Sequence, residues 1–377
     1  MSDILDFFPT NSLSWDQLEY GTDNVYNLHY GLIHKGLPIQ IEVDKCSLPN
    51  IKEDFIPKNY TLCEDGDIAF ADASEDTNDV GKVVEFLNCE NNTIVCGLHT
   101  IHGRDKKKLT IKGFKGYAFS SEVFRQQVRR LAQGTKIYSI SQKNFSDIFI
   151  GIPSKEEQIK IATLLRLLDE RITTQNKIIE QYKSLIKGMS EMLFSWSIRF
   201  KDKNGENYPK WGTKKLGESS TIATGKLDAN AMDENGEYRF YTCAKEHYYI
   251  NQFAFDTEAL LISGNGANVG YIHYYKGKFN AYQRTYILDN FKENIIYVKF
   301  FLDHFLYARI YSEKKEGNTP YIVLSTLSEM DIIFPCIEEQ IKIADSLSKI
   351  SDKIEVEKQF LEQLENQKKY LLQQIFI

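Results

Sequence analysis

Apolar side chains recur at spacings of three and four residues along two long stretches of the chain, residues 153–194 and 335–376. In the first stretch they are Leu165, Leu168, Ile172, Ile179, Tyr182, Ile186, Met189 and Leu193. In the second they are Leu347, Ile350, Ile354, Leu361, Leu364, Leu371 and Ile375. Such alternation over several turns is typical of a coiled-coil seam. We therefore predict that each stretch is one long helix with a seam for a partner helix.

The two stretches are copies of one sequence. Residue 153 aligns with residue 335, and the alignment runs without a gap to residues 194 and 376. Both copies contain Glu-Gln-Ile-Lys-Ile, at residues 157–161 and 339–343, shortly after a proline. Each copy follows a body of different sequence, so the chain consists of two modules of one design. Gln175 and Glu357 put a polar side chain at the same level of both seams, where it either fixes the register or is solvated.

Short apolar runs bounded by turn residues predict strands in both bodies. These runs are residues 67–71, 82–87 and 92–96 in the first body, and 237–241, 259–263, 269–275 and 282–288 in the second. Helical patterns follow at about residues 117–133 and 295–311, and the polar segment 195–215 joins the modules. The predicted fold class is α+β, with two mixed α/β domains, residues 1–152 and 198–334, each followed by a long helix, residues 153–197 and 335–377.

Charge is unevenly distributed along this acidic chain, whose net charge is −6. The first hundred residues hold eighteen Asp and Glu against five Lys. Residues 101–143 reverse the balance, with eleven Lys and Arg against Asp105 and Glu122. A basic cluster of this kind is typical of a surface that binds nucleic acid, and the alternative is a solvated helix face.

Cysteine content and hydropathy limit the cellular setting. The six cysteines, at positions 46, 63, 89, 96, 243 and 336, form no Cys-x-x-Cys pair, so we predict reduced thiols and neither disulfides nor a metal site. No apolar run is long enough for a membrane span, and the first residues lack the pattern of a signal peptide. We expect a cytoplasmic protein.

Motifs for catalysis are missing from the sequence. It contains no phosphate-binding Gly-x-x-x-x-Gly-Lys-Ser/Thr loop, no Gly-x-Ser-x-Gly turn and no His-Glu-x-x-His pair. The glycine-rich segment 264–270 precedes an alternating pattern typical of a strand, whereas a dinucleotide site needs a helix there. We interpret this segment as a tight turn between strands and predict a chain without catalytic activity or a bound cofactor.

Together these features resemble the specificity subunit of type I restriction-modification systems, over essentially the whole chain. The resemblance rests on the two Glu-Glu-Gln-Ile-Lys-Ile-Ala openings at 156–162 and 338–344 and on residues 208–217, 260–270 and 277–284. It implies two target recognition domains, residues 1–152 and 198–334, and two conserved helices that form an antiparallel coiled coil with a pseudo-twofold repeat.

The resemblance also implies a function. Each domain would read one half of a split, asymmetric double-stranded DNA target, and the helices would set the spacing of the halves. The helices would recruit two adenine-methylating modification subunits and, through them, the restriction and translocase subunits. S-adenosylmethionine, ATP and Mg²⁺ would bind to those partners and not to this chain.

DNA contacts are expected from side chains on loops, with Lys and Arg on phosphates. In the first domain the expected residues are His99, Thr100, His102, Arg104, Lys106, Lys107 and Lys108. In the second they are Lys226, Lys245, Asn265, Asn268, Tyr282 and Arg284. The alternative for the two histidines is an ordinary core or capping role, and for Arg284 an internal ion pair.

One difference separates the modules. The second opens with Trp211 and Lys214-Lys215-Leu216-Gly217, and nothing similar precedes Asp3, so we expect the first domain to lack a leading strand. Two other functions stay open at this point. A coiled-coil adaptor would bind no DNA, and a nuclease or methyltransferase with unrecognised motifs would be active alone.

Overall fold

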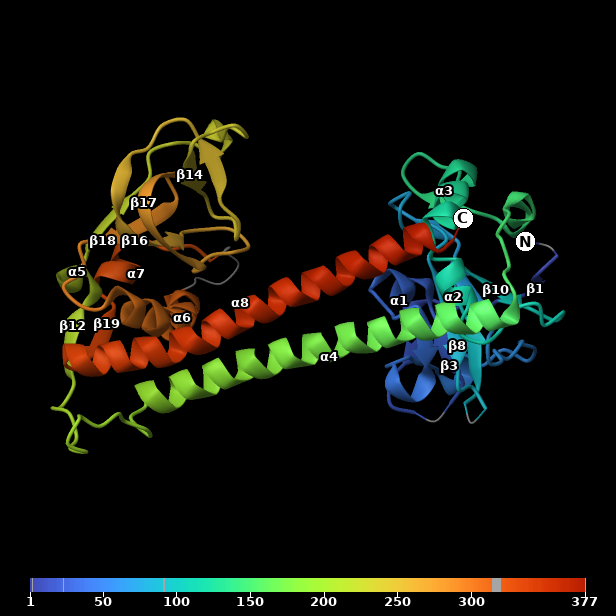
Figure 1. The fold of residues 1–377 in the computed structure, drawn as a ribbon, viewed down its shortest axis with the longest axis horizontal. Helices are drawn as coiled ribbons and strands as arrows, with labels where there is room; N and C mark the ends of the chain where they lie inside the picture. Colours follow the sequence, from blue (N-terminus) through green and yellow to red (C-terminus); the bar gives the residue numbers. More distant parts are fainter. Residues whose placement is uncertain (2, 23, 91, 314–319, 377) are drawn as a thin grey trace. The chain divides into compact units, whose positions relative to one another are not determined.

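The computed structural model describes residues 1, 3–22, 24–90, 92–313 and 320–376. The chain forms two compact units, Met1–Asn176 with Gln359–Ile377, and Lys177–Lys358. The division falls inside both long helices, α4 (Lys155–Phe194) and α8 (Ile337–Gln374), so each unit consists of one body and part of each helix (Figure 1).

Two sheets form the body of the first unit. The larger has the order β1-β10-β6-β8-β4, with the strands β1 (Asp6–Phe8), β10 (Thr100–Arg104), β6 (Ile68–Ala71), β8 (Val83–Leu87) and β4 (Gln40–Glu42). The smaller has the order β2-β5-β3-β9, with the strands β2 (Leu18–Glu19), β5 (Asn50–Ile51), β3 (Tyr26–Leu28) and β9 (Ile94–Cys96). Strands β7 (Ala73–Ser74) and β11 (Tyr138–Ser139) pair separately, and the helices are α1 (Tyr30–His34), α2 (Lys115–Ala118) and α3 (Glu122–Leu131).

Strand β6 shows why this body folds as it does. Its side chains alternate between two cores: Ile68 and Phe70 pack with Phe119 and Phe124, and Ala69 and Ala71 lie in the core that contains Leu28. All four strand residues are fully buried. A continuous apolar run suits a strand that is covered on both faces.

The second unit contains a six-stranded sheet of the order β13-β18-β16-β17-β14-β15. Its strands are β13 (Thr221–Thr224), β14 (Tyr238–Tyr241), β15 (Tyr248–Ile250), β16 (Phe255–Ser263), β17 (Ile272–Ala281) and β18 (Thr285–Asp289). Strands β12 (Gly212–Lys215) and β19 (Asp331–Phe334) form a pair, and the helices are α5 (Leu216–Ser219), α6 (Ile295–Glu313) and α7 (Leu324–Ser328). Leu260 and Ile262 pack with side chains of α6, and Ala259 and Leu261 face a second core.

Four strands of each large sheet share one topology. In the first unit β10 pairs antiparallel with β1 and β6, and β6 pairs antiparallel with β8. In the second unit β18 pairs antiparallel with β13 and β16, and β16 pairs antiparallel with β17. The internal repeat therefore extends from the helices into the bodies, where the sequences differ.

Loop hydrogen bonds repeat along with the strands. The backbone N–H of Asp72 donates to the carbonyl oxygen of His99 at 3.0 Å, and that of Gly264 donates to Arg284 at 2.8 Å. Gly81 donates to Ala71 at 2.7 Å, and Gly270 donates to Ser263 at 2.8 Å. Since each pair joins the same two strand ends, His99 holds the place of Arg284, and residues 72–81 hold the place of residues 264–270.

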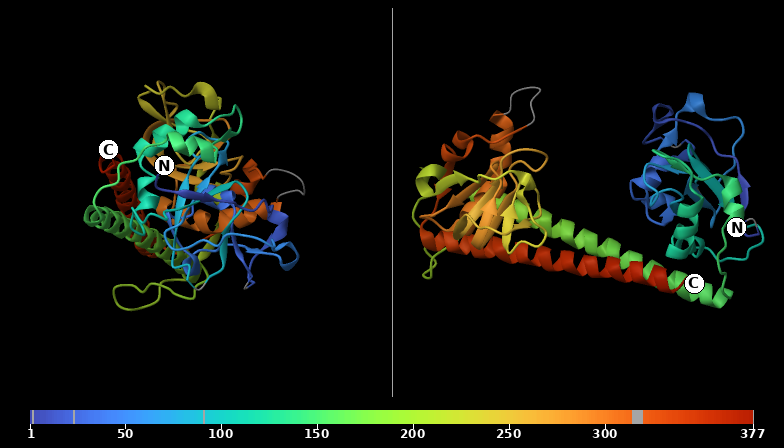
Figure 2. Two further views of the ribbon diagram at one scale, coloured as in Figure 1. Left: turned by 90° about the vertical axis from the view of Figure 1, so that its right-hand side faces the viewer. Right: turned by 90° about the horizontal axis from the view of Figure 1, so that it is seen from above.

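The long helices pair in antiparallel orientation. In the first unit Nζ of Lys368 on α8 lies 2.5 Å from Oδ1 of Asp169 on α4. In the second unit Leu193 and Phe194, at the end of α4, share a core with Leu347 near the start of α8. The colours along α4 and α8 show that the two helices run in opposite directions (Figure 1; Figure 2). The early part of one helix thus meets the late part of the other in both units, and the predicted antiparallel coiled coil is confirmed.

Burial along the helices follows the predicted seam. The seam residues that are buried are Leu165, Leu168, Gln175, Ile179, Leu193, Leu347 and Leu364. Those that are half-buried are Ile172, Tyr182, Ile186, Met189, Ile350, Ile354, Glu357, Leu361, Leu371 and Ile375. The polar residues at the same level of the two seams have different surroundings. Gln175 is 4% exposed, and Oε1 of Glu357 forms an ion pair with Nζ of Lys353 at 2.7 Å.

The repeated glutamine joins each helix to its own body. Oε1 of Gln158 accepts from the N–H of Ile111 at 2.9 Å, and Nε2 donates to the carbonyl of Pro153 at 2.9 Å. Oε1 of Gln340 accepts from the N–H of Asn294 at 2.9 Å, and Nε2 donates to the carbonyl of Pro335 at 2.9 Å. Both side chains are fully buried, so the identical motif makes the same joint twice.

The units differ at their first strand. In the second unit the N–H of Leu216, directly after β12, donates to the carbonyl of Met330 at 2.9 Å. In the first unit the amino group of Met1 donates to the carbonyl of Ile148 at 2.8 Å and so holds the place of Leu216. Among the described residues of the first unit no strand corresponds to β12, as the sequence comparison of the modules indicated.

None of the helices in the described part of the chain is both long and apolar enough to cross a membrane.

Candidate nucleic-acid interface

Four loops of the second unit lie together and contain all six residues expected to bind DNA there. The loops are residues 225–228, 242–247, 264–271 and 282–284. Hydrogen bonds connect them: Asn268 Nδ2 to the carbonyl of Cys243 at 3.1 Å, Gly264 N to the carbonyl of Arg284 at 2.8 Å, and Gln283 N to the carbonyl of Leu227 at 2.9 Å. Since strands of one sheet hold these loops in place, their side chains form one surface.

The side chains on this surface have different environments. Lys226, Lys245 and Arg284 are exposed, and among the described residues no ion pair involves Arg284. Its charge is therefore available to an anion outside the protein. Asn265, Asn268 and Tyr282 are half-buried, and the amide of Asn268 holds its own loop against Cys243. Lys245 and Asn268 also line a cavity of about 410 Å³ next to Lys299 of α6.

The glycine-rich loop 264–270 is a turn between strands, as the sequence predicted. Gly266 and Gly270 have φ angles of +80° and +83°, which residues other than glycine rarely adopt. Strand β17 follows the loop, so no helix N-terminus is present to hold a pyrophosphate.

In the first unit, His99 lies at the place that Arg284 has in the second. It adopts a φ of +54°, and its Nδ1 lies 3.0 Å from Oδ1 of Asp72, the residue after β6. Nearly half of its side chain is exposed, at 48%. His99 is therefore accessible to a ligand, and its carbonyl accepts the loop hydrogen bond that corresponds to the one accepted by Arg284.

Thr100 and His102 do not face the surface. Thr100 is 4% exposed, and its hydroxyl donates to the carbonyl of Gly97 at 2.5 Å. His102 is fully buried, and its Nε2 lies 2.7 Å from Oδ2 of Asp67. Residues of a strand point alternately to the two faces of a sheet, and both faces are covered here. The expected DNA contacts are therefore withdrawn for these two residues, and the alternative core role applies to His102.

Arg104 is held by internal carboxylates. Its Nε donates to Oδ1 of Asp67 at 2.8 Å, its Nη2 donates to Oδ2 of Asp67 at 2.7 Å, and it forms a further ion pair with Glu64. Burial opposes the ionisation of Asp67, yet hydrogen bonds from His102 and Arg104 outweigh it and hold the pKa of this carboxyl below its usual value. The guanidinium thus has an internal function in this structure.

The three lysines after β10 lie at the other end of that strand from His99. All three are exposed; Lys106 lies 3.4 Å from a carboxylate oxygen of Asp6, whereas no ion pair within the described residues involves Lys107 or Lys108. Lys106 and Lys108 line a cavity of about 730 Å³. Its other charged lining residues are Arg104, Lys112, Lys115 and Lys155, with Glu64, Asp65, Asp67 and Asp105. The candidates of the first unit are therefore divided between two ends of one strand.

Sequence reasoning missed the loop between β6 and β8. Residues 72–81 hold the place of residues 264–270, and Glu75, Asp76 and Asn78 are exposed on it. Carboxylates can accept a hydrogen bond from cytosine N4, and Asn can pair with adenine. The acidic character of this loop gave no indication of DNA contact, and only the shared sheet topology identifies it.

Most of the chain matches the model of a known protein family. A family model described as "Type I restriction modification DNA specificity domain" matches residues 94–183 and 208–366. The EcoDI specificity subunit of Escherichia coli is 42% identical over 157 residues, which are 41% of this chain and 34% of that protein. The MjaVIII specificity subunit of Methanocaldococcus jannaschii is 26% identical over 293 residues, 68% of each protein. The matched region thus spans well under two thirds of the Escherichia coli relative.

Solved structures share the fold. An S subunit of a type I restriction-modification system from M. genitalium matches with a TM-score of 0.62 at 17% identity, over 99% of this chain and 94% of that one. A chain from a study of complex assembly and conformational transition in a type I system matches with a TM-score of 0.57 at 16% identity, over 98% and 94%. These likenesses support the α+β fold with two long helices.

Proposed function

We propose, because the chain belongs to the type I restriction-modification DNA specificity family, that it is the DNA sequence-specificity subunit of such a system. The observation that supports this most directly is the set of loop hydrogen bonds that join corresponding strand ends in both large sheets. The hydrogen bonds are the same in both units, but His99 occupies the position in the first unit that Arg284 occupies in the second. Two recognition domains with the same strand arrangement but different side chains at corresponding positions suit a DNA target with two different halves. The alternative of an adaptor that binds no DNA gains no support.

Each half of the chain has an assigned role in this proposal. Residues 1–152 and 198–334 are the two target recognition domains, and residues 153–197 and 335–377 are the conserved helices that set their spacing. In the second domain, Lys226, Lys245, Asn265, Asn268, Tyr282 and Arg284 face the DNA. In the first, His99 and the loop 72–81 face the bases, and Lys106, Lys107 and Lys108 contact phosphates.

Partner proteins carry the chemistry in this proposal, and the chain itself is not catalytic. Two adenine-methylating modification subunits bind S-adenosylmethionine, and restriction subunits use ATP and Mg²⁺, within the cytoplasm. The helices offer an apolar surface for such partners outside the seam. Large apolar side chains exposed there are Ile159, Leu164, Leu167, Leu185 and Met192 on α4 and Ile341, Val356 and Tyr370 on α8.

Methylation mapping tests the function. The chain is expressed with its modification subunit in a host without related systems, and adenine methylation is mapped over the genome. We expect methylation at one split motif with a fixed spacer of unread bases. Methylation at a motif with a single defined half would show that one recognition domain is inactive. An assembled complex that methylates nothing would contradict the proposal, and methylation by the modification subunit alone would assign sequence reading to that subunit.

A further inference from the structure

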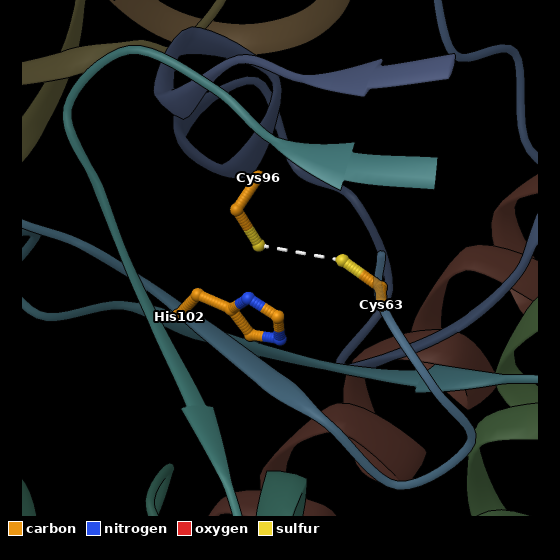
Figure 3. A group of neighbouring side chains, drawn as sticks. All are labelled: Cys63, Cys96 and His102. Carbon is orange, nitrogen blue, oxygen red and sulfur yellow. Dashed lines mark hydrogen bonds between the residues drawn. The ribbon is translucent and has the colours of Figure 1, made fainter. Parts of the chain in front are cut away.

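Two thiols and an imidazole meet inside the first unit, away from the surface proposed to bind DNA. Cys63, Cys96 and His102 are the one group of three His, Cys, Asp or Glu side chains within the described residues whose ligand atoms suit a shared metal ion (Figure 3). Their three ligand atoms lie within 4.8 Å of one another. From this geometry we propose that Cys63, Cys96 and His102 bind a zinc ion.

The backbone brings these residues together from distant parts of the sequence. Cys96 ends strand β9, and the N–H of Cys63 donates to the carbonyl of Ile94 on that strand at 2.9 Å. His102 lies in the middle of β10, opposite Ala69 on β6 and Phe8 on β1. The phenyl ring of Phe8 packs against the imidazole, with 5.2 Å between the ring centres. All three side chains are therefore held by strands or by a strand neighbour, which is the support that a preorganised site needs.

The sulfur atoms have the separation that zinc requires. Sγ of Cys63 lies 3.6 Å from Sγ of Cys96. Two thiolates bound to a tetrahedral zinc at about 2.3 Å place their sulfurs about 3.8 Å apart, whereas a disulfide needs about 2.05 Å. The thiol pair can thus accept zinc with little movement, and a disulfide would need a larger one.

The free nitrogen of His102 faces this pair. Its Nε2 bonds to Oδ2 of Asp67 at 2.7 Å, and Arg104 also donates to that carboxylate. An ionised carboxylate only accepts hydrogen bonds, so the proton of a neutral imidazole lies on Nε2, and Nδ1 presents its lone pair. In Figure 3 this nitrogen points toward the sulfur of Cys96, and it has no hydrogen-bond partner although the residue is fully buried.

An unpartnered buried nitrogen needs a physical explanation, because such groups are rare and destabilising. A bound cation supplies it. A carboxylate on the outer nitrogen of a ligating histidine is also the arrangement that fixes the ring in many zinc sites. The described side chains supply three of the four ligands of a tetrahedral zinc. Two thiolates neutralise the charge of Zn²⁺, so burial of the loaded site leaves no net charge from the metal and sulfurs. Binding releases the two thiol protons to the solvent.

Zinc would have a structural role here. It would connect the chain before β6 to β9 and β10, next to the Asp67–Arg104 pair. It would thereby fix strands that continue into His99 and the lysine loop. The inference does not rest on the proposed function, because metal content can be measured without DNA.

Metal analysis of the purified full chain tests the site. The chain is prepared without chelators and with a reductant that does not bind metal, and zinc is quantified by mass spectrometry. We expect about one zinc per chain in the wild type. The matched control is Cys89→Ser, which changes a buried thiol of the same core that is outside the group. It should keep its zinc, whereas Cys63→Ser, Cys96→Ser and His102→Ala should lose most of it, because each removes one of the three ligands.

A second measurement removes the dependence on variants that fold poorly. Zinc is removed from the wild type with a chelator, and the chain is titrated with Co²⁺, whose absorption reports thiolate ligands. A saturable sulfur-to-cobalt charge-transfer band that zinc abolishes supports the site. A wild-type chain that contains no zinc and shows no such band would overturn the proposal. So would a disulfide between Cys63 and Cys96, found by thiol counting and peptide mapping on metal-free protein.

Discussion

His29 shows how a single side chain can tie stability to pH. It is 2% exposed, and its Nδ1 accepts a hydrogen bond from the N–H of Gly31 at 3.1 Å, which caps helix α1. Burial, followed by the nearby charges of His99 and Lys35, lowers the pKa of His29 to about 4. A protonated ring would lose this acceptor, so the fold needs the neutral form.

The sign of the resulting pH dependence follows from the two states. The unfolded chain protonates His29 near pH 6.5, and the folded chain resists protonation until about pH 4. The stabilisation is fully present above pH 6.5 and is lost as the pH falls toward 4, by up to about 3 kcal/mol. We expect His29→Asn, which can still cap the helix, to be stabilised relative to wild type as the pH falls through this range. Urea unfolding at several pH values measures the difference, and parallel curves for both proteins would contradict the prediction.

Lys107 and Lys108 should act on DNA affinity without affecting sequence choice. Each phosphate contact contributes about 0.9 to the slope of log affinity against log salt concentration. For Lys107→Ala/Lys108→Ala in the complex with the modification subunits, we expect that slope to fall in magnitude by about 2. Lys45→Ala/Lys58→Ala, which removes two exposed charges from the same unit, is the control. A changed target motif in the first double variant would mean that the loop reads bases.

At the scale of elements, the repeated helix start acts as a joint. Gln158 and Gln340 each bond to the backbone of the body before the helix and to the proline before the first turn. The Glu-Gln-Ile-Lys-Ile identity therefore has a structural cause at the glutamine. The neighbouring glutamate differs between copies: Glu339 is fully buried and accepts from Trp211 Nε1 at 2.9 Å, whereas Glu157 is exposed.

Removal of this joint should destabilise its unit. Gln340→Ala removes a fully buried side chain and leaves the N–H of the half-buried Asn294 without its acceptor, which costs about 1–3 kcal/mol. Gln363→Ala, on the exposed face of the same helix, should change stability by less than about 0.5 kcal/mol. Chemical unfolding followed by circular dichroism compares the two variants. Equal midpoints for both would show that the buried glutamine has no special role.

At the scale of the whole molecule, two units of one topology would read two half-sites independently. Arg284→Ala should therefore relax or change only the half of the methylated motif that the second domain reads. His99→Ala should do the same for the other half. Loss of one good base contact costs about 1–3 kcal/mol of discrimination at that position. Methylation maps of both variants test this, and a change in the same half for both would contradict the assignment of one half to each unit.

The sequence by itself determined the features that depend on periodicity and repetition. Spacings of three and four residues predicted both long helices and their seam, and identity between residues 153–194 and 335–376 predicted the two-module design. Short apolar runs predicted seven strands that overlap β6, β8, β9, β14, β16, β17 and β18, although β16 begins four residues before its run and β17 ends six residues after its run. The single helical pattern at 117–133 is two helices, α2 and α3, in the structure. Ser121 begins the second one, because its hydroxyl accepts a hydrogen bond from the N–H of Phe124, and the sequence prediction missed this helix start.

The first body before residue 67 escaped prediction, because β2, β5 and β3 are only two or three residues long and carry no period. Only the tertiary structure decided which candidate side chains reach solvent. Thr100 and His102 share a strand with Arg104, and burial comes from sheets and helices that are remote in sequence. The same holds for Cys63, Cys96 and His102, whose spacing matches no metal motif. Pairing of strands brings them together, and local spacing cannot report a contact that long-range pairing creates.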